Sequence, residues 1–484
     1  MSDRARTGDE HPELRDPLRS LGGMHEAGRL RRGVAEFLRI PLVMIAVFAC
    51  AGLVVAWVDV NVKGGGALRQ LAQAMVPGEG AIDFMSAVAT SIITVTSITF
   101  SVLLLAVQQT ASSLTAVVFD QFLRRRANQL YFGFFIGLST FSFIVLGAAR
   151  KDPAPAFGGA ITMILTVVAL VVLVLLIHGS IDQMRPASVV RSIHELALRA
   201  RERELVLLGR TRGTRRTPEN VPERVVTVHD SGYVVSLDTD RLAGVARAAG
   251  PDVEVIVEGR LGDYIIYDDV VVRLAGVTPQ EDRWDADVRA AFGIDDIRDV
   301  DVEAGYATDQ LENIAWAASS SAQQSPNTAI AAVRALRDLL ARWLAGGERD
   351  RSSRAEQPED LPVVYADGAV PRVLRSIATV TVACAESRQP QTCAELMRAF
   401  AGTAPRVRDN DREEFARAVR SVLPSVIQHA QTLALDEALH DLFRVLRECG
   451  YDADAVAEVR GSLELATVRL LPKPSDEPEA ARPR

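Results

Sequence analysis

The chain has 484 residues, 48% of them hydrophobic and 24% charged, with a formal net charge of −8. This acidic balance, without a basic stripe interleaved with aromatic residues, excludes a general nucleic-acid binder. The length is sufficient for two or three folded units, and nearly all long apolar runs lie before residue 180. The sequence therefore predicts a membrane part followed by a soluble part.

The amino-terminal segment, residues 1–36, is predicted to be a polar tail and not a cleaved signal, because no small-residue cleavage site follows it. Residues 37–185 are predicted to form a four-helix transmembrane domain. Its four apolar runs are each long enough to cross about 30 Å of hydrocarbon. The runs are Ile40–Val58, Phe84–Val107, Leu130–Leu146 and Ala160–Ile177.

The basic residues near the ends of these runs predict the orientation of the chain, since Lys and Arg are enriched in cytoplasmic loops. Three groups fall on one side if the four helices alternate: Arg29 to Arg39, Arg124 to Arg126, and Arg185 with Arg191. Arg150 and Lys151 oppose this bias. We expect both termini, and the soluble part, to be cytoplasmic.

The second run carries a periodic series of polar residues. They are spaced by three, four or seven positions, which places them on one face of a helix. The hydroxyl-bearing members, called the hydroxyl stripe below, are Ser86, Thr90, Thr94, Ser97 and Ser101. Such a stripe either packs helices closely or lines a water-filled path, and both hold if several subunits surround an axis.

Beyond the second run, Val117–Leu123 is predicted to be an amphipathic helix on the inner membrane surface or a helical extension. Residues 186–224 are predicted to be a connecting helix and linker. Residues 225–280 alternate β-branched and aromatic residues with Gly and Asp turns, which predicts a small β-rich module. The expected strands are Val225–Val228, Gly232–Leu237, Val253–Val257, Tyr264–Ile266 and Val270–Leu274.

Residues 281–471 return to helical spacing and are predicted to form a helical domain, ending with a helix over Ala453–Leu471. Residues 472–484 have the composition of a disordered tail. The predicted fold class is thus an α-helical membrane protein of four transmembrane helices, followed by a cytoplasmic α+β region with a β-rich module and a helical bundle.

A polar turn joins two of these helices and is the second candidate site. Its residues of interest are Asn313, Ser325, Asn327 and Thr328. Ser325 with the following proline is typical of a helix start, so capping explains part of the turn. The remaining amides and hydroxyls leave open the binding of a small polar ligand.

No constellation typical of catalysis or metal binding is present in the sequence. The seven histidines occur in no GxSxG or HExxH context, and the four cysteines form no CxxC pair. The acidic cluster from Asp295 to Glu303 lacks the spacing of a calcium loop and is interpreted as a solvated face. We expect neither an enzyme nor a metal or cofactor site.

The chain resembles the domain of unknown function 2254 family of predicted bacterial membrane proteins over roughly residues 30–345. The segments that carry the resemblance are Thr96–Val102 with Gln109–Ser113, Asp120–Gln129, Ser231–Val234, Gly262–Tyr264, and Ala304–Tyr306 with Gln310 and Asn313. The resemblance implies four membrane helices, a soluble region and a bacterial inner-membrane location, but no activity. In the Ser325–Ala329 turn this chain lacks the acidic residue of the family pattern.

Two functions are carried forward. The first is a channel-like or transport-like homo-oligomer in the membrane with a cytoplasmic regulatory domain. The alternative is a non-transporting, membrane-anchored signalling or interaction module. The expected partners are membrane lipid, further copies of the chain, and a small ligand or protein on the cytoplasmic region.

Overall fold

The computed structural model describes residues 18–61, 66–76, 78–115, 125–149, 155–183, 185–298, 303–320, 325–355, 361–429 and 432–451. The chain divides into two compact units. We call residues 1–109 and 118–182 the four-helix unit, and residues 110–117 and 183–484 the α+β unit. The helices predicted within Val117–Leu123 and Ala453–Leu471, and the carboxy-terminal tail, lie outside the described residues.

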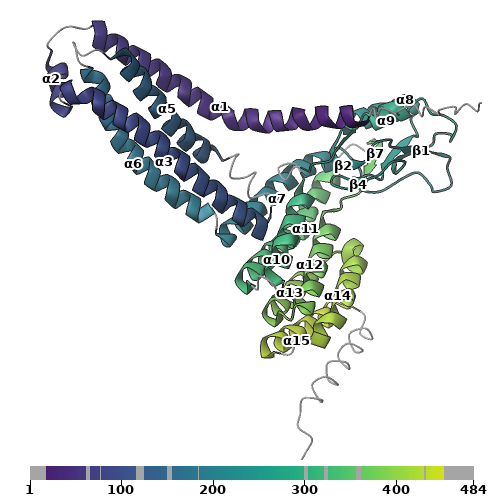
Figure 1. Ribbon diagram of the computed structural model, residues 1–484. Coiled ribbons are helices and arrows are strands. Elements are labelled where there is room, and N and C mark those ends of the chain that lie inside the picture. The colour runs from purple at the N-terminus through teal and green to yellow at the C-terminus, as the bar shows by residue number, and fades with distance from the viewer. Residues whose placement is uncertain are drawn as a thin grey trace, which may run out of the picture. The chain divides into compact units, whose positions relative to one another are not determined.

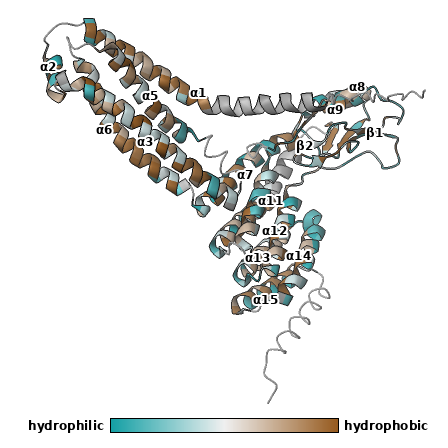
Figure 2. Cartoon of the chain, viewed as in Figure 1, coloured by the Kyte–Doolittle hydropathy of each residue, from teal (hydrophilic) through white to brown (hydrophobic). Residues whose placement is uncertain are grey.

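The four-helix unit contains four helices that are long and apolar enough to cross a membrane, which confirms the prediction from the apolar runs (Figures 1 and 2). The candidate spans are Leu38–Asn61, Gly80–Ser112, Arg126–Ala148 and Ala156–Asp182. They belong to α1 (Leu18–Asn61), α3 (Gly78–Ser113), α5 (Arg126–Ala148) and α6 (Ala156–Gln183). Helix α1 begins inside the segment for which the sequence predicted a polar tail.

Helices α1 and α5 pack against each other through glycines. A Cβ atom at Gly133 would lie 2.8 Å from the Cβ of Met44, and one at Gly137 would lie 2.6 Å from Cδ2 of Phe48. These glycines are four residues apart, the spacing that lets two membrane helices approach closely. Their packing leaves no room for a side chain on this face of α5.

The centre of the bundle is apolar and draws on all four helices. Met85 of α3 packs with Phe141 and Val145 of α5, and Phe48 of α1 and Ile161 of α6 complete the cluster. Because Met85, Phe141 and Val145 are almost fully buried, this cluster defines the inward face of each helix.

A short helix, α2 (Ala67–Met75), lies in the chain between α1 and α3. It buries Ala72 against Ala156 and Ala160 of α6 and exposes Leu68, Leu71 and Met75. A short helix with large exposed apolar side chains on one face is typical of a segment at the membrane interface. The sequence pattern did not predict this helix.

The α+β unit begins with the last turn of α3 and continues with α7 (Pro186–Gly209). Two small sheets follow, with strand orders β1-β5-β3-β7 and β4-β2-β6. The strands are β1 (Glu223–Thr227), β2 (Gly232–Leu237), β3 (Glu254–Val257), β4 (Tyr264–Ile265), β5 (Val270–Ala275), β6 (Phe292–Asp295) and β7 (Val363–Tyr365). Strands β3 and β7 pair in parallel and the other pairs are antiparallel.

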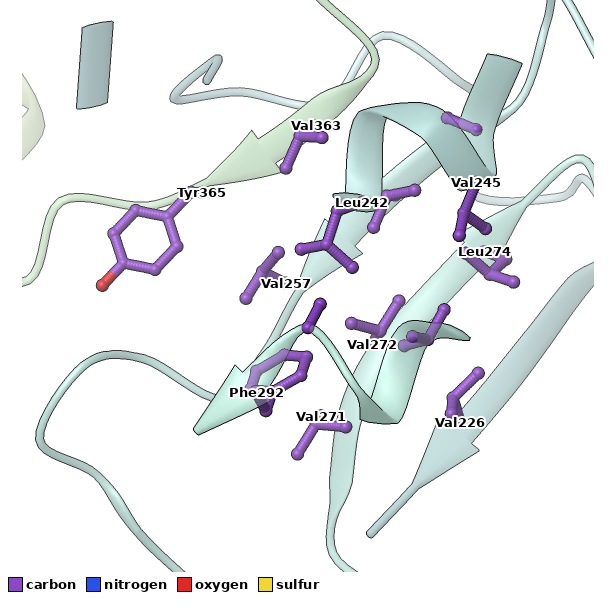
Figure 3. Close-up of a cluster of buried hydrophobic side chains, with 14 of the residues drawn as sticks. Val226, Leu242, Val245, Val257, Val271, Val272, Leu274, Phe292, Val363 and Tyr365 are labelled. Atoms are coloured by element: carbon purple, nitrogen blue, oxygen red, sulfur yellow. The ribbon is translucent and has the colours of Figure 1, made fainter. Parts of the chain in front are cut away.

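The sheets and helix α8 (Thr239–Ala249) share one apolar core, drawn in Figure 3. Leu242 and Val245 of α8 pack with Val226, Val272 and other buried residues of the strands. A second short helix, α9 (Asp285–Arg289), adds Val288 to the same core. Strands β3 and β5 are buried at most of their positions, whereas β1, β2 and β4 each keep an exposed position.

The rest of the unit is helical, and the mixed α+β class is confirmed. The helices are α10 (Ala304–Ser319), α11 (Pro326–Ala355), α12 (Ala369–Glu386), α13 (Pro390–Thr403), η1 (Ala404–Arg406), α14 (Asp409–His429) and α15 (Leu433–Glu448). Residues 281–471, predicted to form a helical domain, also contain the strands β6 and β7. Each is short and completes a sheet whose other strands lie far away in the sequence, so no local pattern marks it.

Candidate functional site

The hydroxyl stripe lies on the part of α3 that the other helices of the chain leave uncovered. All five side chains, Ser86, Thr90, Thr94, Ser97 and Ser101, are exposed in the single chain. The buried face of α3 is formed by Met85, Val88, Ala89, Ile92, Leu103 and Val107. At 3.6 residues per turn the stripe faces away from this buried side. The helices of the chain therefore do not shield the hydroxyl groups.

Next to the stripe, the exposed surface of α3 is apolar. Val95, Ile98, Val102 and Leu105 form this flank. A helix in contact with lipid alone would favour apolar residues all round its exposed surface. The outer surface of α3 thus has one half suited to acyl chains and one half suited to protein or water.

Two of the five hydroxyl groups donate hydrogen bonds to their own helix. The Oγ1 of Thr94 donates to the carbonyl of Thr90, and the Oγ of Ser101 donates to the carbonyl of Ser97, both at 2.9 Å. A hydroxyl oxygen retains its capacity to accept. The stripe thus remains a row of acceptors. Within the described residues, the hydroxyl groups of Ser86, Thr90 and Ser97 are left to donate to a partner outside the protomer.

Helix α3 is built into both units of the chain. Its 36 residues span about 54 Å at 1.5 Å per residue, well beyond a hydrocarbon core of about 30 Å. From Thr110 onward the chain belongs to the α+β unit, where the hydroxyl group of buried Thr115 donates to Oε1 of buried Gln310 on α10. The helix that carries the hydroxyl stripe is therefore continuous with a segment anchored in the α+β unit.

A buried carboxylate, that of Asp59, lies near the carboxy-terminal end of α1. Asp59 at the end of α1 is only 4% exposed and accepts hydrogen bonds from the backbone N–H groups of Phe157 (3.0 Å) and Gly158 (2.8 Å). These groups belong to the first turn of α6, where backbone donors have no partner within the helix. Asp59 is therefore a cap supplied by a different helix. A single Asp near the end of an apolar run was the signal available in the sequence.

Of the four residues predicted to form a polar ligand site, the structure shows a contact between two. Ser325 and Thr328 come together, with their hydroxyl oxygens 2.9 Å apart, and the carbonyl of Ser325 accepts from the backbone N–H of Thr328 and of Ala329. Asn313 on α10 and Asn327 on α11 are both exposed. The contacts of Ser325 are those of a helix start, and ligand binding by the four residues stays a prediction.

The acidic cluster interpreted as a solvated face contains one residue that is buried. Glu303 accepts a hydrogen bond from Arg298 Nε at 2.9 Å, and Arg298 Nη1 donates to Asp309 at 2.6 Å. Arg372 donates to both carboxylate oxygens of Asp309, at 3.0 and 2.7 Å. The interpretation is therefore wrong for Glu303, which is buried between Arg298 of the same stretch and Arg372 of α12.

This ion-pair network is almost closed to solvent, since the side chains of Arg298 and Glu303 are 10% and 8% exposed. Burial alone would lower the pKa of Arg298, but its hydrogen bonds to Glu303 and Asp309 outweigh burial and raise that pKa. The guanidinium also lies 4.6 Å from the ring centroid of Tyr306. Arg298 is thus permanently charged and neutralised within the chain.

Among the described residues, no group of three or more His, Cys, Asp or Glu side chains is arranged to hold a metal ion. The described cysteines are all free thiols. Burial raises the pKa of Cys384 to about 11 and that of Cys393 to about 12. These two thiols are therefore protonated at neutral pH and are poor nucleophiles.

Comparison with known proteins identifies one family. The family model described as predicted membrane protein (DUF2254) matches residues 35–402. The match confirms the resemblance noted from the sequence and extends it at its carboxy-terminal end. No curated protein and no solved structure matches the chain.

Proposed function

We propose, from the premise that this chain belongs to the DUF2254 family of predicted membrane proteins, that it is a channel-like or transport-like homo-oligomer. In this assembly the hydroxyl stripes of several α3 helices face one another around a polar path. The α+β unit regulates that path. The observation that carries the proposal is the position of the stripe on the side of α3 that the protomer leaves uncovered.

The physical argument rests on the cost of polar groups in hydrocarbon. A row of hydroxyl groups that faces acyl chains lacks the hydrogen-bond partners that protein or water would supply. The apolar flank at Val95, Ile98 and Val102 satisfies the requirement for lipid contact on the neighbouring surface. An oligomer that buries the stripe and exposes the flank accounts for both halves of α3.

The continuity of α3 supplies the route for regulation. Thr115 ties the end of α3 to Gln310 on α10, so a movement of α10 acts directly on the helix that carries the stripe. A rigid secondary element with two arrangements is the kind of structure that transmits such a change. We propose that the α+β unit gates the path through this connection.

Cross-linking tests the oligomer. With Cys50→Ala and Cys449→Ala as the background, Ser97→Cys is expected to form a disulfide between copies in lipid bilayers, because the stripe residues of neighbouring copies face each other. The control is Met85→Cys on the buried face of α3, which should give no cross-link. Equal cross-linking of the two variants would contradict the proposed arrangement.

Ion flux in liposomes tests the path. The double variant Thr94→Leu with Ser97→Leu replaces the centre of the stripe with apolar side chains, and we expect it to lose most of the flux. The control, Val95→Leu with Ile98→Leu, changes the apolar flank of the same helix and should retain the flux. A native protein without flux for any common ion would exclude the channel function.

The alternative, a non-transporting signalling or interaction module, is favoured by one observation. The hydroxyl groups of Thr94 and Ser101 already donate to their own helix, as small polar residues do where helices only pack. This function predicts the same Ser97→Cys cross-link but no flux in the native protein. The two experiments together therefore separate the two functions.

The proposal also places both termini in the cytoplasm. Arg39 at the start of the first span, and Arg185 and Arg191 after the fourth, support this orientation. In spheroplasts, a membrane-impermeant maleimide should then label Cys449 only after permeabilisation. Cys449 is partly exposed and therefore accessible to the reagent once the membrane is open. Labelling of intact spheroplasts would reverse the orientation.

A further inference from the structure

A pocket in the α+β unit has the composition of an anion site. It encloses about 90 Å³ between α7, the loop after β3, the end of β7 and the starts of α10 and α12. A single water requires roughly 10–15 Å³ of such space, so the pocket is large enough for a small polyatomic ion. Four arginines line it: Arg201, Arg260, Arg372 and Arg375. We call it the arginine pocket.

Two of the four guanidinium groups are neutralised by the chain. Arg201 forms two parallel hydrogen bonds with Asp367, at 3.0 and 2.5 Å. Arg372 forms the corresponding pair of bonds with Asp309. In contrast, the side chains of Arg260 and Arg375 contact no carboxylate in the part of the chain that the structure describes. These two guanidinium groups have their donors available for a ligand.

The three carboxylates that line the pocket are already occupied. Asp367 pairs with Arg201, and Asp263 accepts from the backbone N–H of Arg260 at 3.0 Å. Glu204 accepts from Arg201 at 3.1 Å and from the backbone N–H of Ala304 at 2.9 Å. The acidic side chains of the pocket are thus engaged with donors of the protein.

Backbone dipoles add to the positive character of the pocket. Gly305, in the first turn of α10, and Gly368, the residue that precedes α12, both line it. The amino-terminal end of a helix carries a partial positive charge. The first N–H of each helix is already engaged, that of Ala304 by Glu204 (2.9 Å) and that of Ala369 by Asp367 (3.1 Å). A Cβ at Gly368 would lie 3.3 Å from Nη1 of Arg260, which shows that this guanidinium lies at the start of α12.

A buried phenol supplies one further donor. Tyr365 lines the pocket, and its hydroxyl oxygen accepts from the backbone N–H of Leu261 at 3.1 Å. Figure 3 shows this hydroxyl group directed away from the labelled apolar side chains of the core. Burial raises the pKa of Tyr365, so the phenol keeps its proton at neutral pH and can donate it in a hydrogen bond.

We propose that the arginine pocket binds the phosphate group of a small molecule, with Arg260 and Arg375 as its ion-pair partners. Guanidinium groups bind phosphate oxygens through paired hydrogen bonds, and the charge of two such groups matches a dianion. The volume limits the enclosed part of the ligand to little more than the phosphate group. This inference concerns the α+β unit alone and is independent of whether the hydroxyl stripe conducts.

The test is calorimetric titration of the full-length chain in detergent, with ionic strength held constant by chloride. Three probes distinguish the source of the phosphate group: inorganic phosphate, glycerol phosphate, and phosphatidic acid in the micelle. The variants are Arg260→Gln and Arg375→Gln. The control is Arg247→Gln, which removes the same charge from an exposed position on α8 outside the pocket.

We expect saturable binding of at least one probe, weakened about tenfold in each pocket variant and unchanged in the control, since a charge-assisted hydrogen bond contributes about that factor. Both pocket arginines are exposed at the surface, so these variants should fold. Equal binding by all three variants would show non-specific attraction and overturn the proposal. If none of the three probes bound, the proposal would be overturned as well.

Discussion

The two units of the chain differ in whether their polar side chains find partners within the protomer. In the α+β unit the buried charges are neutralised within the chain, as Arg298 is by Glu303 and Asp309. In the four-helix unit the buried carboxylate of Asp59 is also satisfied, but the hydroxyl stripe of α3 is left at the surface. The proposed homo-oligomer accounts for this difference, because groups from outside the protomer would cover the hydroxyl stripe of α3.

Removing one member of the buried network tests the first half of this comparison with the largest expected effect. Arg298→Ala removes the main ion-pair partner of buried Glu303 and should destabilise the α+β unit by about 3–5 kcal/mol. Denaturant unfolding followed by tryptophan fluorescence measures this change, with Trp57→Phe as background because the other three tryptophans lie in the α+β unit. As control, Arg417→Ala breaks a fully surface pair with Glu413 and should cost less than about 1 kcal/mol. A similar loss of unfolding free energy in both variants would show that the buried network stabilises the unit no more than a surface ion pair does.

The next largest expected loss of stability comes from disturbing the close packing between α1 and α5. Gly137→Ala places a methyl group against Phe48 and should destabilise the four-helix unit by about 1–3 kcal/mol. Gly147 on the same helix has no atom near its Cβ position, so Gly147→Ala should be neutral or slightly stabilising. Thermal unfolding in detergent, followed by circular dichroism, compares the two. If Gly137→Ala were tolerated equally well, the helices would be less tightly packed than described.

The cap on α6 tests whether the polar groups inside the four-helix unit are as well satisfied as those of the α+β unit. Asp59→Ala leaves the backbone N–H groups of Phe157 and Gly158 without their acceptor and should cost about 1–2 kcal/mol. Asp59→Asn retains an acceptor oxygen and should lose less. The same thermal measurement applies. Identical melting of the alanine variant and the native chain would contradict the capping role.

A pH titration gives the smallest effect. Burial raises the pKa of Glu204 above its usual 4.5, and its hydrogen bonds from Arg201 and Ala304 offset this only in part. The folded chain therefore binds more protons than the unfolded chain just above pH 4.5, so stability should fall as the pH rises through that window. Glu204→Gln removes the titrating group and should flatten this part of the stability profile. If stability depends on pH in the variant as it does in the native chain, the dependence arises from another titrating group.

The features predictable from the sequence were those with a local signal. Hydropathy over a single run located the four candidate spans, and alternation between β-branched residues and turns located five of the seven strands found in the described residues. The hydroxyl stripe was likewise visible, because its residues repeat along one helix. Which side of α3 the other helices cover depends on packing across the bundle, and no periodicity within α3 reports it.

The features that were missed depend on residues far apart in the chain. Strand β7 pairs with β3, which lies about a hundred residues earlier. Arg372 joins the network of Arg298 and Asp309 only because α12 packs beside α10. The arginine pocket likewise draws Arg260 and Arg375 from a loop and a helix with no shared motif. Such sites have no sequence signature because their members are adjacent only after folding.

The cap supplied by Asp59 has a consequence for biogenesis. Asp59 is synthesised 98 residues before Phe157, one of the two residues whose N–H groups it accepts. The first span therefore enters the bilayer with a carboxyl group whose final partners do not yet exist, and a lone acid in a span is costly to insert. The cap on α6 can therefore form only when the last candidate span has been made. A ribosome stalled before residue 157 would leave the first helix in a less stable state.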